Sequence, residues 1–398
     1  MKKTLVALAA LAVTSAFAQS SVTISGVADV GIQYSNTRKE NQFVAPATPA
    51  TAATPSAVAT LGTNAGAPFN GNAVNSVAID RGNNNRIIFS GVEDLGGGLA
   101  ATFAFQMRFE PKNGNVESNG RPLFQGETTV GLRGGFGALK LGRWLPANQQ
   151  LNGGTIDPWG VTTVATLPYA AGFATSPGDA GGEGRIGSAI FYSTPSFGGF
   201  AGHLTLGSAK GATGKIYQSL AGSYNNGPIN AMIGYERNVQ GDTLANLGAN
   251  YDLGVAKIYA GYGRANGGST ADRAGGAFNA VASTAFIGGL NNGTAATTGQ
   301  GQVAVNGTVT SASIGAKIPL GAATILVGYG RVSGDVVGAV RTDADHKIGL
   351  GVNYALSKRT SVYSDIAGVT NRKVLSNGVA GTTGARSTQF DVGIAHSF

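Results

Sequence analysis

The stretch STQFDVGIAHSF (Ser387–Phe398) alternates between two kinds of side chain. Phe390, Val392 and Ile394 fall on one face, with His396 as its polar member. The opposite face carries small and polar residues, which are Gln389, Asp391, Gly393, Ala395 and Ser397. A period of two is typical of a β-strand with one apolar face. The stretch therefore predicts a strand that faces a nonpolar medium on one side and a polar one on the other.

The same unit recurs along the chain: a run of about ten alternating residues, and then a break, as in membrane β-strands. Short Gly-rich breaks such as 95–98 alternate with long polar ones, namely 37–78, 111–125, 145–184, 265–307 and 371–386. This alternation indicates antiparallel neighbours, with the turns at one end and the loops at the other. We predict roughly sixteen strands, an even number as in single-chain barrels. They begin near Val22, Asn84, Leu99, Gln125, Ala138, Arg185, Phe200, Ile216, Ile229, Asp242, Val255, Thr308, Ala323, Thr342, Thr360 and Ser387.

The composition fits strands and tight turns better than helices. The 398 residues include 64 Gly, only 12% are charged, and none is Cys. Frequent Gly without a collagen period indicates turns and closely approaching backbones. The lack of Cys excludes a disulfide framework and a thiolate metal site. After the first residues, no run of about 18 apolar residues predicts a membrane-spanning helix.

The first residues, MKKTLVALAALAVTSAFAQ, have the pattern of a secretory signal peptide. Lys2 and Lys3 precede an apolar run, and Ala16-Phe17-Ala18 forms a small-x-small cleavage site. We therefore expect residues 1–18 to be a signal peptide and 19–398 to be a transmembrane β-barrel domain. Removing the two lysines lowers the net charge from +8 to +6. The basic residues are scattered, which argues against nucleic acid as a partner.

Alternation is clearest in LAATFAFQMRFE (Leu99–Glu110), which places three Phe on one face and Gln106, Arg108 and Glu110 on the other. A soluble β-sandwich would share this period of two. A wet lumen accounts better for the polar face, and aromatic residues recur near strand ends, as in an interfacial girdle. Within hydrocarbon every backbone N–H and C=O must be paired, so a sheet must close on itself. We expect the strand that ends at Phe398 to pair with SVTISGVADVGIQY (Ser21–Tyr34) and close the barrel.

Several stretches resemble the general outer-membrane porins of Gram-negative bacteria, specifically the betaproteobacterial type. They are SSVTISGVADVGIQYSN from Ser20, RIIFSGVEDLGGGL from Arg86, VGLRGGFGALKLGR from Val130, YSTPSFGGF from Tyr192, and the final Phe. The resemblance implies an all-β, closed, antiparallel 16-stranded barrel in the outer membrane, with short periplasmic turns, long external loops and an infolded third loop. It also implies a homotrimer among outer-membrane lipids, passive diffusion of ions and small hydrophilic solutes, and recognition of the C-terminal strand by the outer-membrane assembly machinery.

Pore selectivity depends on width and on the charges at the narrowest point. The third long loop, 145–184, carries the acids Asp157, Asp179 and Glu183, and we expect it to fold into the barrel; the alternative is an external flap. We expect a basic wall opposite it, formed by Arg86, Arg108, Arg133, Arg143 and Arg185. Each Arg alone could instead be a solvated charge at a loop end. Because a lipid-facing Arg costs about 2–4 kcal/mol at the midplane, orientation toward the lumen is favoured. The basic excess predicts a weak preference for anions.

The sequence offers little for catalysis. Its three His (His203, His346 and His396) lie outside any nucleophile motif, and no metal-ligand spacing occurs. We therefore expect neither an enzyme nor a cofactor. Two other classes remain open: a barrel-anchored adhesin or receptor that uses the long external loops, and an outer-membrane hydrolase. Ion conductance distinguishes the adhesin from a pore, and a His within reach of a Ser and an acid would indicate the hydrolase.

Overall fold

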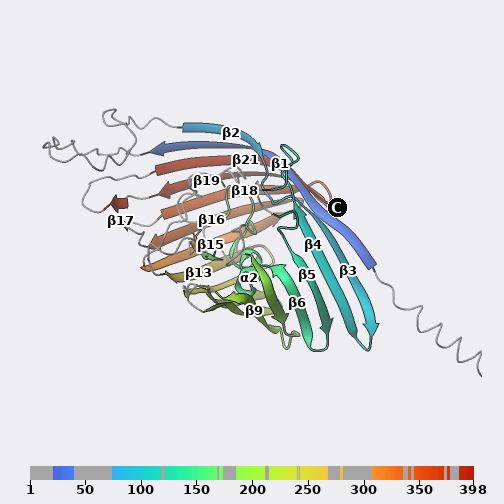
Figure 1. Cartoon of the computed structure of the whole chain (residues 1–398). Helices are drawn as coiled ribbons and strands as arrows, with labels where there is room; N and C mark the ends of the chain where they lie inside the picture. Colours follow the sequence, from blue (N-terminus) through green and yellow to red (C-terminus); the bar gives the residue numbers. More distant parts are fainter. Residues whose placement is uncertain are drawn as a thin grey trace, which may run out of the picture.

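A computed structural model of the chain describes residues 21–39, 74–117, 122–167, 170–173, 185–210, 215–239, 241, 243–267, 278–280, 307–334, 339–341, 345–371, 374–376 and 385–398. One large antiparallel sheet forms the wall of a closed barrel (Figure 1). Its strands are β1 (Ser21–Lys39), β2 (Val74–Asp80), β3 (Arg86–Gly96), β4 (Leu99–Arg108), β5 (Thr128–Gly134), β6 (Gly137–Trp144), β8 (Ile186–Ser193), β9 (Phe200–Lys210), β10 (Ile216–Asn226), β11 (Ile229–Arg237), β12 (Thr243–Asp252), β13 (Lys257–Gly267), β15 (Gly307–Leu320), β16 (Ala323–Gly334), β18 (Asp345–Ala355), β19 (Thr360–Asn371) and β21 (Ala385–Ser397).

The wall has sixteen strands because β2 and β3 act as one. Both pair with β1, β3 along its first half and β2 along its second. Between them, five residues, 81–85, oppose only three on β1, since Asp80 pairs with Gly31 and Arg86 with Val27. The predicted sixteen-stranded barrel is confirmed, and each predicted strand start lies within three residues of an observed one. The prediction placed most of β2 inside the first long loop, 37–78, because an insertion in a strand breaks the alternation.

The barrel closes between β1 and β21. Residues from Val27 to Lys39 pair in register with residues from Ser397 back to Ala385. Gly26 and Phe398 then exchange two backbone hydrogen bonds of 3.0 and 3.1 Å. This seam leaves neither strand with an open edge, which is what hydrocarbon requires. The predicted pairing of the Phe398 strand with the first strand is therefore confirmed.

The two faces of the wall differ as the alternation predicted. Phe390, Val392 and Ile394 are exposed on the outer face, whereas Gln389 and Asp391 are buried inside. Tyrosines mark the end of the wall that carries the short turns: Tyr192, Tyr224, Tyr251 and Tyr354 each lie one or two residues before the end of their strand. Such a rim is typical of an interfacial aromatic girdle.

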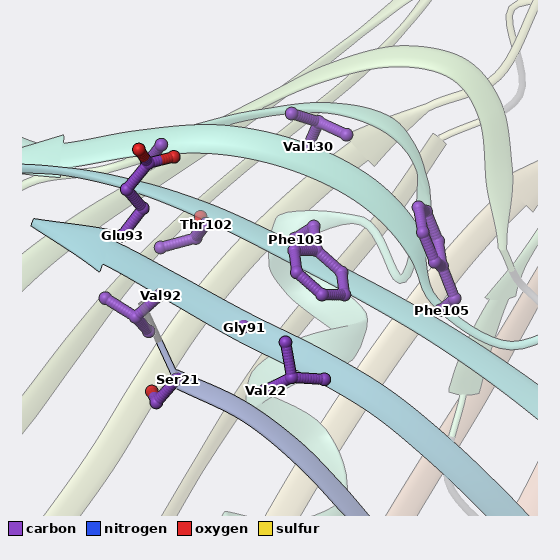
Figure 2. A pocket seen from close by; sticks show the side chains of 10 residues that line it. Ser21, Val22, Gly91, Val92, Glu93, Thr102, Phe103, Phe105 and Val130 are labelled. Atoms are coloured by element: carbon purple, nitrogen blue, oxygen red, sulfur yellow. The ribbon is translucent and has the colours of Figure 1, made fainter. Parts of the chain in front are cut away.

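The outer wall is hollowed at β1, β3, β4 and β5. The hollow has a volume of about 420 Å³ and is lined mainly by apolar side chains, among them Val22, Phe103, Phe105 and Val130 (Figure 2). At its centre the ring of Phe103 lies over Gly91 on β3, where a Cβ would collide with it. By the parity of the strands the hollow lies on the face away from the lumen.

The long connections carry further short elements. A helix, α2 (Ala147–Ile156), follows β6 and lies inside the ring of strands (Figure 1). Two small sheets pair β7 (Ala170–Phe173) with β14 (Phe278–Ala280), and β17 (Ala339–Arg341) with β20 (Val374–Ser376). Within the described ranges, no helix combines the length and hydropathy needed to cross a bilayer.

The seam offers a direct test of closure. A methyl group at Gly31 would lie 2.5 Å from the carbonyl oxygen of Val392 and 2.9 Å from Cα of Gly393, both backbone atoms. We therefore expect Gly31→Ala to lower the free energy of unfolding by about 1–3 kcal/mol, the usual cost of overpacking. Urea unfolding of the refolded barrel, followed by tryptophan fluorescence, measures this. Gly368→Ala on β19, where no atom lies within 4 Å of the added methyl, should leave the value unchanged.

Candidate functional site

The third long loop lies against the inner wall, as predicted, and crosses it strand by strand. Its first helical N–H groups have no partner within α2, and hydroxyls of the wall accept from them. Ala147 N donates to Thr205 Oγ1 on β9 at 3.0 Å, and Asn148 N donates to Ser219 Oγ on β10 at 3.0 Å. On β12, Asn250 Nδ2 donates to the carbonyl of Thr155 at 3.1 Å. The loop thus advances along the wall in the order of the strands.

A row of lumen-facing glycines makes room for the loop. We call these residues the glycine row: Gly234 on β11, Gly248 on β12, Gly261 on β13, Gly315 on β15, Gly328 on β16 and Gly349 on β18. Their missing side chains are replaced by loop atoms. Ile156 lies on Gly248 and Gly261, Pro158 on Gly315, and Trp159 on Gly328 and Gly349. Because a Cβ at these positions would meet loop atoms, glycine is what allows the loop to approach the wall backbone.

The far end of the loop is tied to three more elements. Trp159 Nε1 donates to Asp365 Oδ1 on β19 at 2.6 Å. Val164 N donates to Asp391 Oδ2 on β21 at 3.0 Å, and Thr163 N donates to the carbonyl of Gly82 at 2.7 Å. Leu167 and Ala165 are fully buried with Trp159 in one apolar cluster. The loop therefore covers the inner wall from β9 round to the insertion between β2 and β3.

The single acid in the described part of the loop is turned away from the open lumen. Asp157 is 1% exposed, and its carboxylate accepts hydrogen bonds from the backbone N–H groups of Trp159, Val161 and Leu167, at 2.8 to 3.3 Å. Burial raises the pKa of the Asp157 carboxyl to about 6, although the three backbone donors and nearby Lys347 act to lower it. Asp157 thus folds the loop on itself. The other two predicted acids, Asp179 and Glu183, lie outside the described residues.

The open side of the lumen faces β3 to β8, where the predicted arginines occupy different environments. Arg86, at the start of β3, is half-buried and donates to the carbonyl of Asn84 at 3.1 Å. Arg108 lies directly opposite it on β4 but is buried, and its Nη1 lies 3.4 Å from Glu117 Oε2. Arg143 on β6 donates Nε to the carbonyl of Gln125 at 3.2 Å. The structure therefore brings Arg86 and Arg108 together at the loop end of β3 and β4. Arg143 lies at the same end of β6, where it pairs with Thr128 on the face of Val130 and Leu141.

Arg133 and Arg185 lie apart from that group. Arg133 is exposed beside the short turn that joins β5 to β6, at the opposite end of the barrel. Arg185 immediately precedes β8 and is 6% exposed. The sequence predicts which face an arginine occupies through parity. The position of an arginine along the pore axis depends on how far neighbouring strands are staggered, and parity gives no information about stagger.

Several basic residues of the lumen were missed by the sequence analysis. Lys140 on β6 points inward, and its Nζ forms an ion pair with Glu127 Oε1 at 2.7 Å. Arg81 lies in the insertion between β2 and β3, and its guanidinium pairs with Glu110 at 2.9 Å and with Glu117. Lys140 could have been found by parity, since Leu139 and Leu141 flank it. Arg81 could not, because the insertion has no alternation to follow.

The insertion at 81–85 is itself a buried polar junction. Asp29 Oδ1 on β1 accepts from Gly82 N at 2.8 Å and from the hydroxyl of Tyr363 on β19 at 2.7 Å. Asn85 forms two hydrogen bonds with the backbone of Asp29. These contacts fix the insertion beside the seam, where it receives the end of the third loop.

Neither His203 nor His396 lies in a catalytic arrangement, and His346 on β18 has its Nδ1 2.5 Å from the hydroxyl of Tyr329 on β16. Both ring nitrogens of His203 lie within hydrogen-bond distance of serine hydroxyls, Ser193 at 2.9 Å and Ser223 at 3.1 Å, so neither is left for an orienting acid. His396 is exposed on the outer face, with Nδ1 at 2.9 Å from Thr360 Oγ1.

The hydrogen bond from Trp159 to Asp365, which holds the loop on β19, can be tested by removing the indole donor. Trp159→Phe keeps the ring on the glycine row but leaves the buried carboxylate of Asp365 without its indole partner. We expect the attachment of the loop to weaken by about 1.5–3 kcal/mol, the range for hydrogen bonds to charged groups. Single-channel recordings should then show more current noise and brief closures. Trp144→Phe removes the chain's other indole without touching this tie, and should record as the unmodified protein does.

Comparisons with known proteins agree with this architecture. Residues 4–373 match the family described as Gram-negative porin. Outer membrane porin protein 32 of Delftia acidovorans is 30% identical over 244 residues, 59% of this chain and 59% of its own length. An outer membrane porin protein of Bordetella pertussis is 30% identical over 264 residues, 60% of each chain. The chain thus spans about three fifths of the length of these relatives.

Solved structures share the fold over nearly the whole chain. The anion-selective porin from Comamonas acidovorans superimposes with a TM-score of 0.67 at 23% identity, covering 96% of this chain and 100% of its own. In-vitro folded OmpT of Vibrio cholerae has a TM-score of 0.56 at 11% identity, covering 95% of this chain and 98% of its own. With the family match extending over most of the sequence, the chain belongs to the Gram-negative porins.

Proposed function

We propose that this protein is a pore of the outer membrane through which ions and small hydrophilic solutes diffuse passively, with a weak preference for anions. Residues 1–18 act as the export signal and 19–398 form the pore domain in this proposal. The mechanism needs no energy coupling and no conformational cycle. Width is set by the third loop, and selectivity by the charges beside the remaining passage.

The observation that carries the anion preference is the contrast between the two sides of that passage. On the loop, the residues exposed to the lumen include Gln150, Gly154, Gly160 and Val161, which carry no charge. Asp157 is buried beneath them. On the opposite wall, Arg86 remains half-exposed, and Lys140 is half-exposed with its charge partly compensated by Glu127. An ion in the passage thus meets positive charge on one side without a described loop carboxylate on the other.

The proposed constriction contains Arg86 and Arg108, together with Lys140, and Arg143 and Arg185 lie at its loop end. Arg108 contributes less, since Glu117 compensates its charge. Arg133 acts at the opposite mouth. Asp179 and Glu183 stay part of the proposal as loop acids that moderate the preference. The solved structure described as an anion-selective porin supports the sign of the proposal by analogy of fold.

We propose that three copies assemble side by side at the hollow in the outer wall. The wall is short on one side of the hollow: β5, which lines it, has 7 residues, and β6 and β8, which follow β5 round the barrel, have 8 each. A tilted strand needs about 9–11 residues to cross the hydrocarbon layer. Clustered rings also mark this face, with Phe103 and Phe105 at 5.4 Å and Phe105 and Phe124 at 5.8 Å between centroids. Contact with a second copy would shield the short strands of this part of the wall from lipid, while lipid covers the longer strands elsewhere.

We also propose that the strand ending at Phe398 is the segment that the outer-membrane assembly machinery binds.

Reversal potentials across planar bilayers test the selectivity. A lumen charge about 4 Å from an ion is worth about 1 kcal/mol in water, or about a fivefold change in local ion occupancy. We expect the double variant Arg86→Gln, Lys140→Gln to shift the anion-to-cation permeability ratio toward one at about 0.1 M salt, where screening is moderate. Arg331→Gln, which removes an exposed charge on the outer face of β16, should leave the ratio unchanged. Clear cation preference in the unmodified protein would contradict the proposal, and absence of any current would favour an adhesin or receptor.

Oligomeric state in detergent tests the contact face. Val130 is 59% exposed in the hollow, and Val327 is 41% exposed on β16. We expect Val130→Trp to fill the hollow and yield folded monomers, and Val327→Trp to remain a trimer, as measured by native electrophoresis and light scattering. A trimer in both cases would place the contact on another face.

A further inference from the structure

A pair of lysines lies in the lumen near the end that carries the short turns. Lys257 begins β13 and is directly opposite Lys317 on β15. Both point inward. Lys257 shares its face with Tyr259, whose cross-strand partner Asn250 binds the third loop, and Lys317 shares its face with Gly315 of the glycine row. The pair lies two residues beyond the track of the loop, toward the exit from the constriction.

Two like charges placed directly opposite on one face of a sheet destabilise it. Across the described ranges, no ion pair within 4.0 Å involves either lysine. The carboxylate across from Lys257, that of Asp252 on β12, instead accepts from Gly254 N in the short turn at 2.8 Å. The Lys317 ammonium lies over the ring of Tyr259, 5.7 Å from its centroid. Opposite charge reaches the pair from Asp252, across from Lys257, and from the buried Asp157, near Lys317, without an ion pair within 4.0 Å among the described residues. A like-charged pair that breaks a stability rule in this way is expected at functional positions.

We propose that Lys257 and Lys317 form an exit subsite for doubly charged oxyanions of the phosphate class. Directly opposed residues have their Cβ atoms about 4.5–5.5 Å apart, so two flexible stems can bring both ammonium groups onto one small anion. Each ammonium offers three donors, and phosphate offers several acceptor oxygens. A singly charged ion such as chloride or acetate gains less from the second lysine.

The position of the pair suits a relay of weak sites. An anion that has passed Arg86 at the loop end and Lys140 midway along β6 next meets Lys257 and Lys317 below the loop. Conduction through a charged pore needs sites that attract the ion and still release it, and several weak sites do this better than one strong site. Lys347, on the same wall, is 7% exposed and is covered by the loop, so it does not serve as a step. This inference rests on the proposed pore function and extends it to the class of solute.

The test uses single-channel chloride currents of the refolded full barrel, with inorganic phosphate added at slightly alkaline pH. We expect phosphate to lower the chloride current of the unmodified protein, with acetate at the same concentration having much less effect. In the double variant Lys257→Gln, Lys317→Gln, the phosphate concentration for half the effect should rise about tenfold, as for loss of a charge-assisted hydrogen bond. Lys358→Gln, in the exposed turn after β18, removes a single charge at the same end and should behave as the unmodified protein.

The outcomes separate this inference from the pore proposal. If the double variant keeps the anion preference in potassium chloride but loses the phosphate effect, the subsite is supported. If phosphate acts equally on both proteins, it binds elsewhere and the subsite is overturned, and so it is if phosphate has no effect on an anion-preferring channel. Cation preference or no current at all would instead overturn the pore proposal. Unfolding in urea, measured for every variant, confirms that the barrels compared are folded.

Discussion

The requirement that no backbone polar group remain unpaired in hydrocarbon governs this molecule. A strand with an open edge would expose a row of N–H and C=O groups to lipid, each at a cost of several kcal/mol. The seam between β1 and β21, with thirteen residue pairs in register, removes the last such edge. Once the ring is closed, side chains along each strand point alternately outward to lipid and inward to the lumen. The inner surface that results is available for a loop and for charges.

Closure creates the cavity, and the third loop divides it. The loop occupies the inner surface from β9 round to the insertion at 81–85, held by wall hydroxyls at its start and by Asp365 and Asp391 at its end. The remaining passage runs along β3 to β8, where basic residues gather. Charges that could oppose one another across the pore are instead partly neutralised within the wall, as in the group of Arg81, Arg108, Glu110 and Glu117. The residual field therefore comes from a few half-exposed side chains.

The sequence predicted the barrel well because a period of two, interrupted by Gly-rich turns, is a local signal. Strand starts, the closing pair and the inward parity of Arg86 and Arg108 all follow from it. The missed features depend on long-range contacts. The helix α2 has little amphipathic pattern and takes its end partners from β9 and β10, so its existence depends on the wall. β2 was hidden by the insertion beside it. Asp157 was expected to face the pore, as a candidate acid of the constriction. Its burial follows from backbone donors as far as ten residues away, at Leu167, which spacing alone does not reveal.

The glycine row has a consequence for how such a pore can vary. Because loop side chains lie directly on the wall backbone at these glycines, the loop has no room to shift toward the wall. Substitutions under the loop would push the whole segment into the passage, so a small change there alters the bore over several strands at once. Substitutions on the free side of the loop, at positions such as Gly154 or Gly160, would narrow it at one point only. Changes on the wall side of segment 147–167 thus alter the channel diameter over a long stretch, whereas changes on its free side alter the diameter locally.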